Sequence, residues 1–280
     1  MRLSVDHVTR YSYERPVRGL VQSHRLTPSL FQGQKVISWE ITVEGGEGQG
    51  GGALAVRGAD FTDGAGDRIQ GWSLAGPLSE VAVTVRGTVE TTDTAGMLKG
   101  YREAINPCAY KLETAMTAGS AALAALAEAV SDADGPLALA HGLSAAVAAA
   151  IAYRPGVTQA HTSASEALAL GEGVCQDHAH ALIALARLRD LPARYVSGYL
   201  FADASGAAHE AAHAWAEIHV PGLGWIGFDP ANACCPDERY IRLASGLDAR
   251  DAAPIRGVAR GGQAGEEAMD VAVAVLSSAQ

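Results

Sequence analysis

Residues 173–200 read GVCQDHAHALIALARLRDLPARYVSGYL, and this stretch decides the fold. Cys175, Ala179, Leu182 and Ala186 recur at spacings that place them on one face of an α-helix. The sequence DLP ends that pattern, and ARYVSGYL then has the composition and alternation of a β-strand. The stretch therefore predicts a helix that begins near Cys175 and ends before DLP, followed directly by a strand.

Cys175 is a candidate nucleophile because of its place at the predicted helix start. A thiol attacks as its thiolate, which the unpaired N–H groups and the dipole of a helix N-terminus stabilise. The Cys175 N–H could form half of an oxyanion hole, and Gly173 would leave room for a substrate backbone. The alternative is a small buried residue, as free cysteines often are. A nucleophile needs a base and an orienting group, so the rest of the sequence must decide.

A predicted hairpin carries the candidate base and orienting group. HAWAEIHV begins with His213, WIGFDP contains Asp229, and PGLG joins these two strands. If PGLG is a strict four-residue loop, Val220 opposes Trp225 and Asp229 faces away from His213. If His219 opposes Trp225 instead, Asp229 lies diagonal to His213 on the same face, within side-chain reach. A connection one residue longer, or one that holds a bulge, would give this second register, and a Cys-His-Asp triad requires it.

The remaining segments predict an α+β protein. Alternating stretches separated by glycine-rich turns make residues 1–100 an N-terminal antiparallel β domain, folded on itself as a sandwich. Alanine-rich residues 112–152 predict two or three helices, and TSASEALALGEG a short helix that opens with a capping box. Residues 101–280 are therefore predicted to pack helices on an antiparallel sheet, and the alternating MDVAVAVL supplies a C-terminal strand to this unit.

Composition and charge limit the kinds of partner that the chain could bind and the cellular compartment in which we expect it. The chain has 280 residues, is 48% hydrophobic and carries a formal charge of −10, which argues against general affinity for nucleic acid or anionic lipid. The N-terminal stretch lacks an apolar core of signal-peptide length, and no apolar run is long enough to span a bilayer comfortably. Four cysteines are too few for a disulfide framework. We expect a cytoplasmic protein without nucleic-acid or membrane partners; its oligomeric state is left open.

The two central motifs resemble a known family. GVCQDHAHALIALARLRDLPARYVSGYL together with HAWAEIHVPGLGWIGFDPAN is similar to the bacterial branch of the transglutaminase-like superfamily. VQSHRLTPS resembles its N-terminal region, and PIRGVARGG its C-terminal segment. The resemblance implies a papain-like catalytic core with Cys175 as nucleophile, His213 as base and Asp229 as orienting group, without dependence on calcium. The chain departs from the pattern at His178, where an aromatic residue is more usual, and at Cys234, which with the next cysteine occupies a generally polar stretch.

These residues predict thiol acyl chemistry. The expected reaction is cleavage of an amide or peptide bond in a peptide or protein substrate, through an acyl-enzyme and without a cofactor. Two alternatives stay open, namely amine transfer to a protein glutamine and a non-catalytic binding module that keeps the fold. Gln176, Trp215 and Tyr199 flank the presumed site and are candidates for the substrate cleft.

A zinc site is the main alternative use of these side chains. Cys175, His178 and His180 cluster in sequence, and His209 lies four residues before His213. Two histidines four residues apart can bind one zinc ion when both lie on the same face of a helix. His209 is expected on a loop and His213 on a strand, so this arrangement is not available to them. No metal is predicted.

Overall fold

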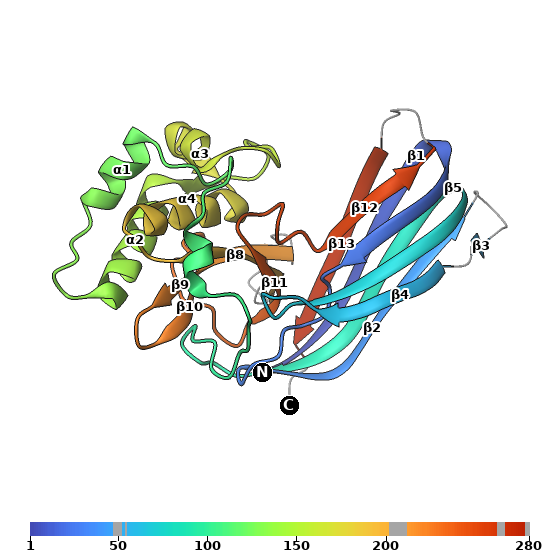
Figure 1. The fold of residues 1–280 in the computed structure, drawn as a ribbon, viewed down its shortest axis with the longest axis horizontal. Coiled ribbons are helices and arrows are strands. Elements are labelled where there is room, and N and C mark those ends of the chain that lie inside the picture. The colour runs from blue at the N-terminus through green and yellow to red at the C-terminus, as the bar shows by residue number, and fades with distance from the viewer. Residues whose placement is uncertain (47–51, 54, 202–211, 262–266, 278–280) are drawn as a thin grey trace.

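The computed structural model describes residues 1–46, 52–53, 55–201, 212–261 and 267–277. The protein is an α+β structure with two parts that lie side by side (Figure 1). We call the strands β1 to β5, β12 and β13 the β domain, and the elements from η1 to β11 the core domain. No helix within the described ranges combines the length and the apolar character needed to cross a membrane.

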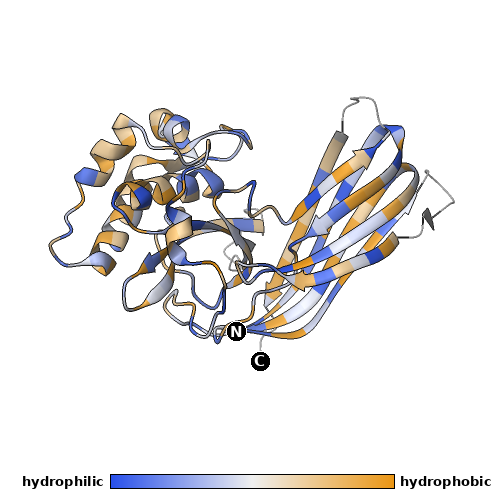
Figure 2. Ribbon diagram, in the orientation of Figure 1, coloured by the Kyte–Doolittle hydropathy of each residue, from blue (hydrophilic) through white to orange (hydrophobic). Residues whose placement is uncertain are grey.

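The β domain is built on two long antiparallel strands, β1 (Arg2–His24) and β5 (Arg68–Thr91). Shorter strands pair with their outer edges, namely β13 (Glu267–Ser277) and β12 (Ile255–Arg260) with β1, and β2 (Gln34–Gly46) and β4 (Ala55–Thr62) with β5, while β3 (Gly52–Ala53) pairs with β2. Hydrophobic and hydrophilic residues alternate along these strands (Figure 2), as expected where one face is buried.

One hydrophobic core fills the β domain. β1 shifts register between Ser12 and Gly19, and buried side chains from both sides of this irregularity, such as Val5 and Leu20, belong to the same cluster. Bulges bend strands and increase their twist. The curved strands (Figure 1) therefore enclose a common core.

The two C-terminal strands differ from the prediction, which placed the C-terminal strand in the 101–280 unit. β12 pairs with residues 19–24 of β1, and β13 with residues 3–13 of the same strand. Alternation in MDVAVAVL marks a strand with two unlike faces, but it carries no information about which strand lies beside it. The division of the chain at residue 100 stays a prediction.

The core domain packs helices on a four-stranded antiparallel sheet. The strand order is β10 (Gly224–Phe228), β9 (Ala212–Val220), β8 (Ala193–Leu200) and β11 (Tyr240–Gly246). The other elements are η1 (Pro107–Lys111), α1 (Ala121–Glu128), α2 (Pro136–Ala150), α3 (Ala164–Leu170), α4 (Cys175–Leu188), and the short parallel pair β6 (Ala152–Tyr153) and β7 (Glu172–Gly173). Every residue from 177 to 187 in α4 is buried, so this helix is the centre of the domain.

Several local predictions are confirmed. α4 begins at Cys175, and β8 covers ARYVSGYL. α3 opens with the predicted capping box, in which the Ser163 hydroxyl accepts from the Glu166 N–H and the Glu166 carboxylate accepts from the Ser163 N–H. Gly171 ends α3 in the left-handed conformation (φ 72°), which glycine adopts without steric cost.

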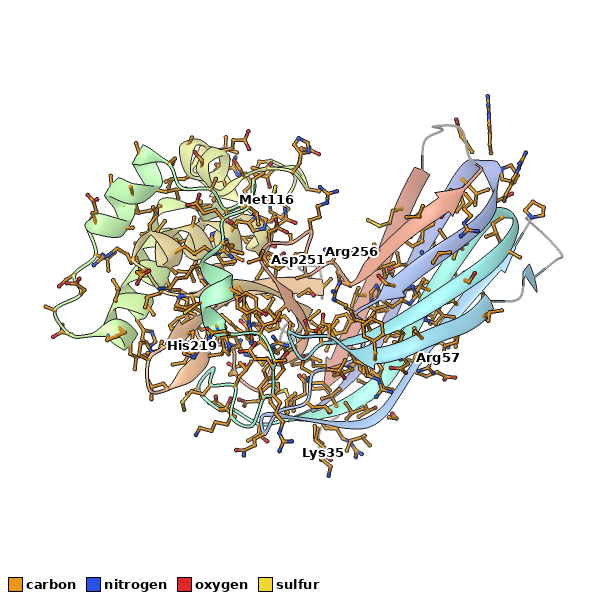
Figure 3. The ribbon with its side chains drawn as sticks, in the orientation of Figure 1. Lys35, Arg57, Met116, His219, Asp251 and Arg256 are labelled. Atoms are coloured by element: carbon orange, nitrogen blue, oxygen red, sulfur yellow. The ribbon has the colours of Figure 1, made fainter. Side chains whose placement is uncertain are left out.

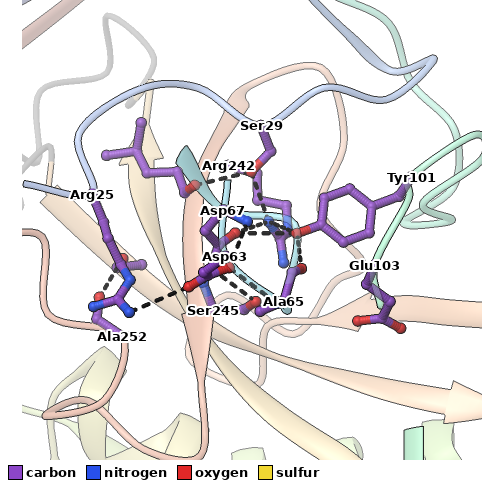
Figure 4. A network of polar contacts seen from close by, with 12 residues as sticks. Arg25, Ser29, Asp63, Ala65, Asp67, Tyr101, Glu103, Arg242, Ser245 and Ala252 are labelled. Carbon is purple, nitrogen blue, oxygen red and sulfur yellow. Dashed lines mark hydrogen bonds and ion pairs between the residues drawn. The ribbon is translucent and has the colours of Figure 1, made fainter. Parts of the chain in front are cut away.

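A buried ionic network joins the two domains, and Figure 4 shows the part of it around Arg242 and Asp67. Arg242 on β11 lies 3.2 Å from the Asp67 carboxylate of the β domain and 2.8 Å from Glu217 on β9. Glu217 also binds Arg194 on β8 at 2.7 Å. These four side chains are at most 2% exposed. Charges this deeply buried need partners, so the network strongly constrains how the sheet of the core domain meets the β domain.

Candidate active site

The register of the β9–β10 hairpin is the one that the triad requires. Trp225 lies opposite His219, which Figure 3 labels on this hairpin, and Phe228 lies opposite Ala216. The loop itself is shorter than predicted, because Gly224 already pairs with Val220 and only residues 221–223 connect the strands.

A tight turn explains the short loop. The Val220 carbonyl accepts from the Leu223 N–H at 3.0 Å, and Gly222 has a φ of 82°. Proline at the second and a left-handed glycine at the third position are typical of a type II turn. The predicted extra residue was therefore wrong, while the predicted alternative with His219 opposite Trp225 is correct.

His213 and Asp229 meet across this hairpin. His213 Nε2 lies 2.6 Å from Asp229 Oδ2, and both side chains are buried. Burial by itself would lower the pKa of His213, but hydrogen bonds to Asp229 and to Cys175 outweigh it and raise that pKa to about 10. Burial opposes ionisation of Asp229, yet the contacts with His213 hold the pKa of this carboxyl below its usual range.

Cys175 stands at the first residue of α4, with Val174 as the N-cap, and its side chain is partly exposed. His213 Nε2 faces Asp229, which leaves the other ring nitrogen for Cys175, and Cys175 helps to raise the pKa of the ring. The structure thus brings together the three side chains that the sequence singled out. The arrangement can hold an imidazolium beside a thiolate at a helix N-terminus, where both the ring charge and the dipole favour the anion.

Asp177 secures the start of α4. Its Oδ2 accepts from the Val174 N–H at 2.8 Å and from the Thr158 hydroxyl at 2.7 Å. A Cβ on Gly173 would lie 2.7 Å from this same oxygen, and only 2.8 Å from the Asp177 Cβ. The glycine is therefore needed to accommodate Asp177. That it also leaves room for a substrate backbone stays a prediction.

Two further residues bind the Asp229 carboxylate. Asn232 Nδ2 donates to Oδ2 at 2.7 Å, and the Tyr240 hydroxyl donates to the same oxygen at 2.8 Å. Oδ1 accepts from the backbone N–H of Ala231 at 3.0 Å. Sequence reasoning missed both side chains. The sequence DPAN indicated a turn that could have suggested Asn232, but nothing local to Tyr240 connects it with Asp229, eleven residues earlier.

The predicted cleft residues have different surroundings. Trp215 is buried and stacks on His213, with ring centroids 6.4 Å apart and planes 26° apart. Gln176 is partly exposed at the helix start and donates to the Ala160 carbonyl at 3.2 Å. Tyr199 does not line a cleft beside Cys175. It is 1% exposed in the hydrophobic cluster of the β domain, where its hydroxyl binds His7 Nδ1 at 2.7 Å.

The histidines of the zinc alternative have other partners. Both ring nitrogens of His178 lie 2.9 Å from backbone carbonyl oxygens, those of Val174 and Ile151. His180 Nε2 accepts from the Ala249 N–H at 3.0 Å, and burial lowers the pKa of its ring to about 4. The described ranges hold no group of three His, Cys, Asp or Glu side chains that could bind a metal; His209 lies outside them.

Comparison with known families agrees with this geometry. The profile of the transglutaminase-like superfamily matches residues 124–230, and that of the bacterial transglutaminase-like N-terminal region matches residues 3–90. The chain belongs to the transglutaminase-like superfamily. The first match contains Cys175, His213 and Asp229, and the second covers β1, β2, β4 and most of β5.

Relatives of this transglutaminase-like protein match nearly all of the chain or part of it. An uncharacterized protein of Mycobacterium leprae is 29% identical and covers 98% of both chains. An uncharacterized protein of Mycobacterium tuberculosis is 41% identical over 115 residues, which are 38% of this chain and 37% of that protein. A crystal structure from Cytophaga hutchinsonii, named "Putative Cysteine Protease", has a TM-score of 0.71 at 20% identity and covers 100% of this chain and 92% of that one. At that identity the likeness shows the fold alone.

Proposed function

We propose that this transglutaminase-like protein is a thiol-dependent acyl-transfer enzyme that cleaves an amide or peptide bond. In this proposal Cys175 is the nucleophile, His213 the general acid and base, and Asp229 the group that orients the ring. The single observation that supports it is the position of His213, whose Nε2 lies 2.6 Å from Asp229 and whose pKa is raised by Asp229 and by Cys175 at the start of α4. Family membership supports a thiol enzyme in general terms.

The reaction follows from these positions. The Cys175 thiolate attacks the carbonyl carbon, and the backbone N–H of Cys175 donates to the oxyanion that forms. His213 gives its proton to the leaving nitrogen as the C–N bond breaks, which leaves a thioester on Cys175. Water then attacks the thioester, His213 takes one of its protons, and the C–S bond breaks to restore the thiolate. Asp229 stays ionised and holds the ring throughout.

We also propose a peptide or protein substrate and a reducing, cytoplasmic setting. The four cysteines are all free, which is consistent with such a compartment.

Selective alkylation tests the nucleophile. A limiting dose of iodoacetamide at about pH 6, followed by peptide mass spectrometry, should label Cys175 ahead of Cys108, although Cys108 is the more exposed thiol. Cys234 and Cys235 should react last, since burial raises the pKa of both thiols, that of Cys235 to about 11. Labelling of Cys175 that is no faster than that of Cys108 would contradict the proposal.

Product analysis separates the possible outcomes of acyl transfer. The protein is incubated with casein and a fluorescent primary amine, and both new amino termini and incorporated amine are measured. New termini that disappear in Cys175→Ala support hydrolysis. Amine incorporation that disappears in the same variant identifies amine transfer instead. If Cys175→Ala retains all activity, neither hydrolysis nor amine transfer proceeds through Cys175. Cys108→Ala is the matched control, and this variant should keep the activity of the wild-type protein.

A further inference from the structure

The segment that contains Tyr240 connects the β domain with the Asp229 carboxylate. β11 pairs with β8 at the edge of the core sheet, and its Tyr240 hydroxyl donates to Asp229 Oδ2 at 2.8 Å. Tyr240 also packs edge-on against Trp215, at 5.5 Å between ring centroids, and Trp215 in turn stacks on His213. Tyr240 thus touches both the carboxylate and the aromatic ring that supports the histidine.

The β domain holds this segment on the C-terminal side of Tyr240. Gln34 makes two hydrogen bonds with the backbone of Arg242, accepting from its N–H at 2.8 Å and donating to its carbonyl at 2.9 Å. Ser29 donates its own N–H to the same carbonyl at 2.9 Å. The Arg242 guanidinium binds the Ser29 hydroxyl at 2.6 Å and the Asp67 carboxylate at 3.2 Å (Figure 4).

The β domain also holds the N-terminal side. The hydroxyl of Thr91, the last residue of β5, donates to the Glu238 carbonyl. Ile241 and Leu243, which alternate with Arg242 along β11, are buried in the hydrophobic cluster of the β domain. The β domain therefore holds the backbone on both sides of Tyr240. Within the described ranges, Tyr240 supplies the only hydroxyl that binds Asp229 Oδ2.

We propose that Tyr240 is a positioning residue for Asp229, and that the β domain acts on the active site by holding β11 so that this hydroxyl reaches the carboxylate. This gives the N-terminal region a role in the chemistry of the core domain. The inference rests on the proposed function, because its consequence is the reactivity of Cys175. Tyr240 acts through Asp229 and His213 and is not itself a catalytic residue.

The physical effect is on the orientation of one carboxylate oxygen. Asp229 Oδ2 accepts hydrogen bonds from His213, Asn232 and Tyr240, and hydrogen bonds to an ionised carboxylate are about twice as strong as neutral ones. Without the Tyr240 hydroxyl the carboxylate protonates more readily and turns more freely. The interaction between the His213 imidazolium and the Asp229 carboxylate then becomes weaker, so the charged ring stabilises the neighbouring thiolate less.

Two variants test the link to Tyr240. Tyr240→Phe removes the hydroxyl and keeps the ring against Trp215. Tyr199→Phe is the matched control, since it removes the hydroxyl of another buried tyrosine, one that binds His7 at the same domain interface. We expect alkylation of Cys175 at about pH 6 to slow roughly five- to tenfold in Tyr240→Phe and to stay within about twofold in Tyr199→Phe. Where Cys175 of the wild-type protein is alkylated selectively, equal rates in the two variants would overturn the proposal.

Two variants of the β domain test the role of that domain. Thr91→Val removes the hydroxyl that binds Glu238 with little change of shape, and Gln34→Leu removes the contacts with Arg242. Thr91→Val keeps the test valid if Gln34→Leu does not fold. We expect each to slow alkylation by about two- to fivefold, and to add little to Tyr240→Phe in the double variants, because residues that act through one path are not additive. Unchanged rates, or full additivity, would overturn the role of the β domain.

A spectroscopic measurement separates this inference from the proposed function. The proton on His213 Nε2, in a 2.6 Å hydrogen bond with a carboxylate, should give a strongly downfield proton resonance in the wild-type protein. Tyr240→Phe and Thr91→Val should shift it, and Tyr199→Phe should not. This outcome supports the positioning role even if Cys175 shows no selective alkylation, in which case only the proposed function fails. A resonance that is unchanged in Tyr240→Phe overturns the inference while leaving the proposed function intact.

Discussion

Trp225 of β10 lies directly opposite His219 of β9, and this pairing brings Asp229 to the face of the hairpin on which His213 lies. Side chains alternate along a strand, so a shift of one residue would turn Asp229 to the other face. The type II turn at residues 220–223 sets the register. A loop of three residues at one end of the hairpin thus decides whether the histidine has a carboxylate partner at the other.

Asp229→Asn should lower the reactivity of Cys175. An asparagine keeps the shape but removes the charge that helps to raise the pKa of His213 to about 10, so the ring is protonated less often near neutral pH. We expect alkylation of Cys175 at about pH 6 to fall by at least tenfold. Asp237→Asn is the control, because that carboxylate binds Arg239 in the same loop region. Similar rates in the two variants would contradict the role given to Asp229.

Gly198→Ala should damage both stability and the site. Gly198 lies opposite His213, and a Cβ there would approach the Ile241 carbonyl to 2.2 Å and the Trp215 ring to 2.6 Å. We expect a loss of about 1–3 kcal/mol in the free energy of unfolding, as for overpacked cores, together with slower alkylation of Cys175, because the ring that stacks on His213 must move.

The control for this prediction is a glycine in a strand with ordinary room around it. A Cβ on Gly58 in β4 would have its nearest contact at 3.5 Å. Gly58→Ala should therefore leave the urea midpoint almost unchanged and leave alkylation of Cys175 unaffected. If Gly198→Ala behaves in the same way, Trp215 does not support His213 as we describe.

The parts of the site that could be predicted from sequence are those with local signals. The helix that begins at Cys175 follows from apolar periodicity, and the possible faces of His213 and Asp229 follow from strand alternation. Alternation left two registers open. The dipeptide of Pro221 and Gly222 contained the missing information, since Pro-Gly favours a type II turn and hence a short loop.

The parts that could not be predicted depend on contacts between distant segments. Tyr240 reaches Asp229 because β11 pairs with β8, and Tyr199 is covered by the β domain rather than by substrate. An apolar or aromatic residue in a strand signals that its face is buried, but not what buries it. The same gap explains why the C-terminal strand was grouped with residues 101–280 although β13 pairs with β1, since an alternating strand is equally suited to either sheet.

Glu217→Gln should destabilise the domain interface strongly. Glu217 is fully buried between Arg194 and Arg242, with a contact below 3 Å to each. The neutral side chain would leave two buried guanidinium groups with too little negative charge around them, and breaking such a buried network costs about 3–5 kcal/mol. Urea unfolding would measure this as a lower midpoint.

A surface carboxylate is the control for Glu217. Asp60 binds Arg57 and Arg68, but both arginines are about half exposed. Exposed ion pairs contribute at most about 1 kcal/mol, so Asp60→Asn should shift the urea midpoint much less than Glu217→Gln. Equal shifts would mean that the buried network contributes no more than a surface pair.

Acid should destabilise the protein through buried neutral histidines. Burial lowers the pKa of His7, His24 and His180 to about 4. The unfolded chain binds these protons near pH 6.5, so it holds more protons than the folded chain between about pH 4 and 6.5, and stability falls as the pH falls through that window. The raised pKa of His213 acts in the opposite direction, since its contribution is complete below about pH 6.5 and is lost as the pH rises toward about 10.

His24→Gln isolates one of these protons. The amide keeps a hydrogen-bond donor near Gln22, the partner of His24 Nε2 at 3.0 Å, but does not titrate. Between pH 6.5 and 5 the variant should lose about 1.6 kcal/mol less of its unfolding free energy than the wild-type protein does, because up to one fewer proton is taken up on unfolding. His161→Gln, at an exposed ring, should follow the wild-type curve. Urea unfolding at several pH values measures the difference, and a His24→Gln curve parallel to the wild-type one would show that His24 does not contribute to the loss of stability in acid.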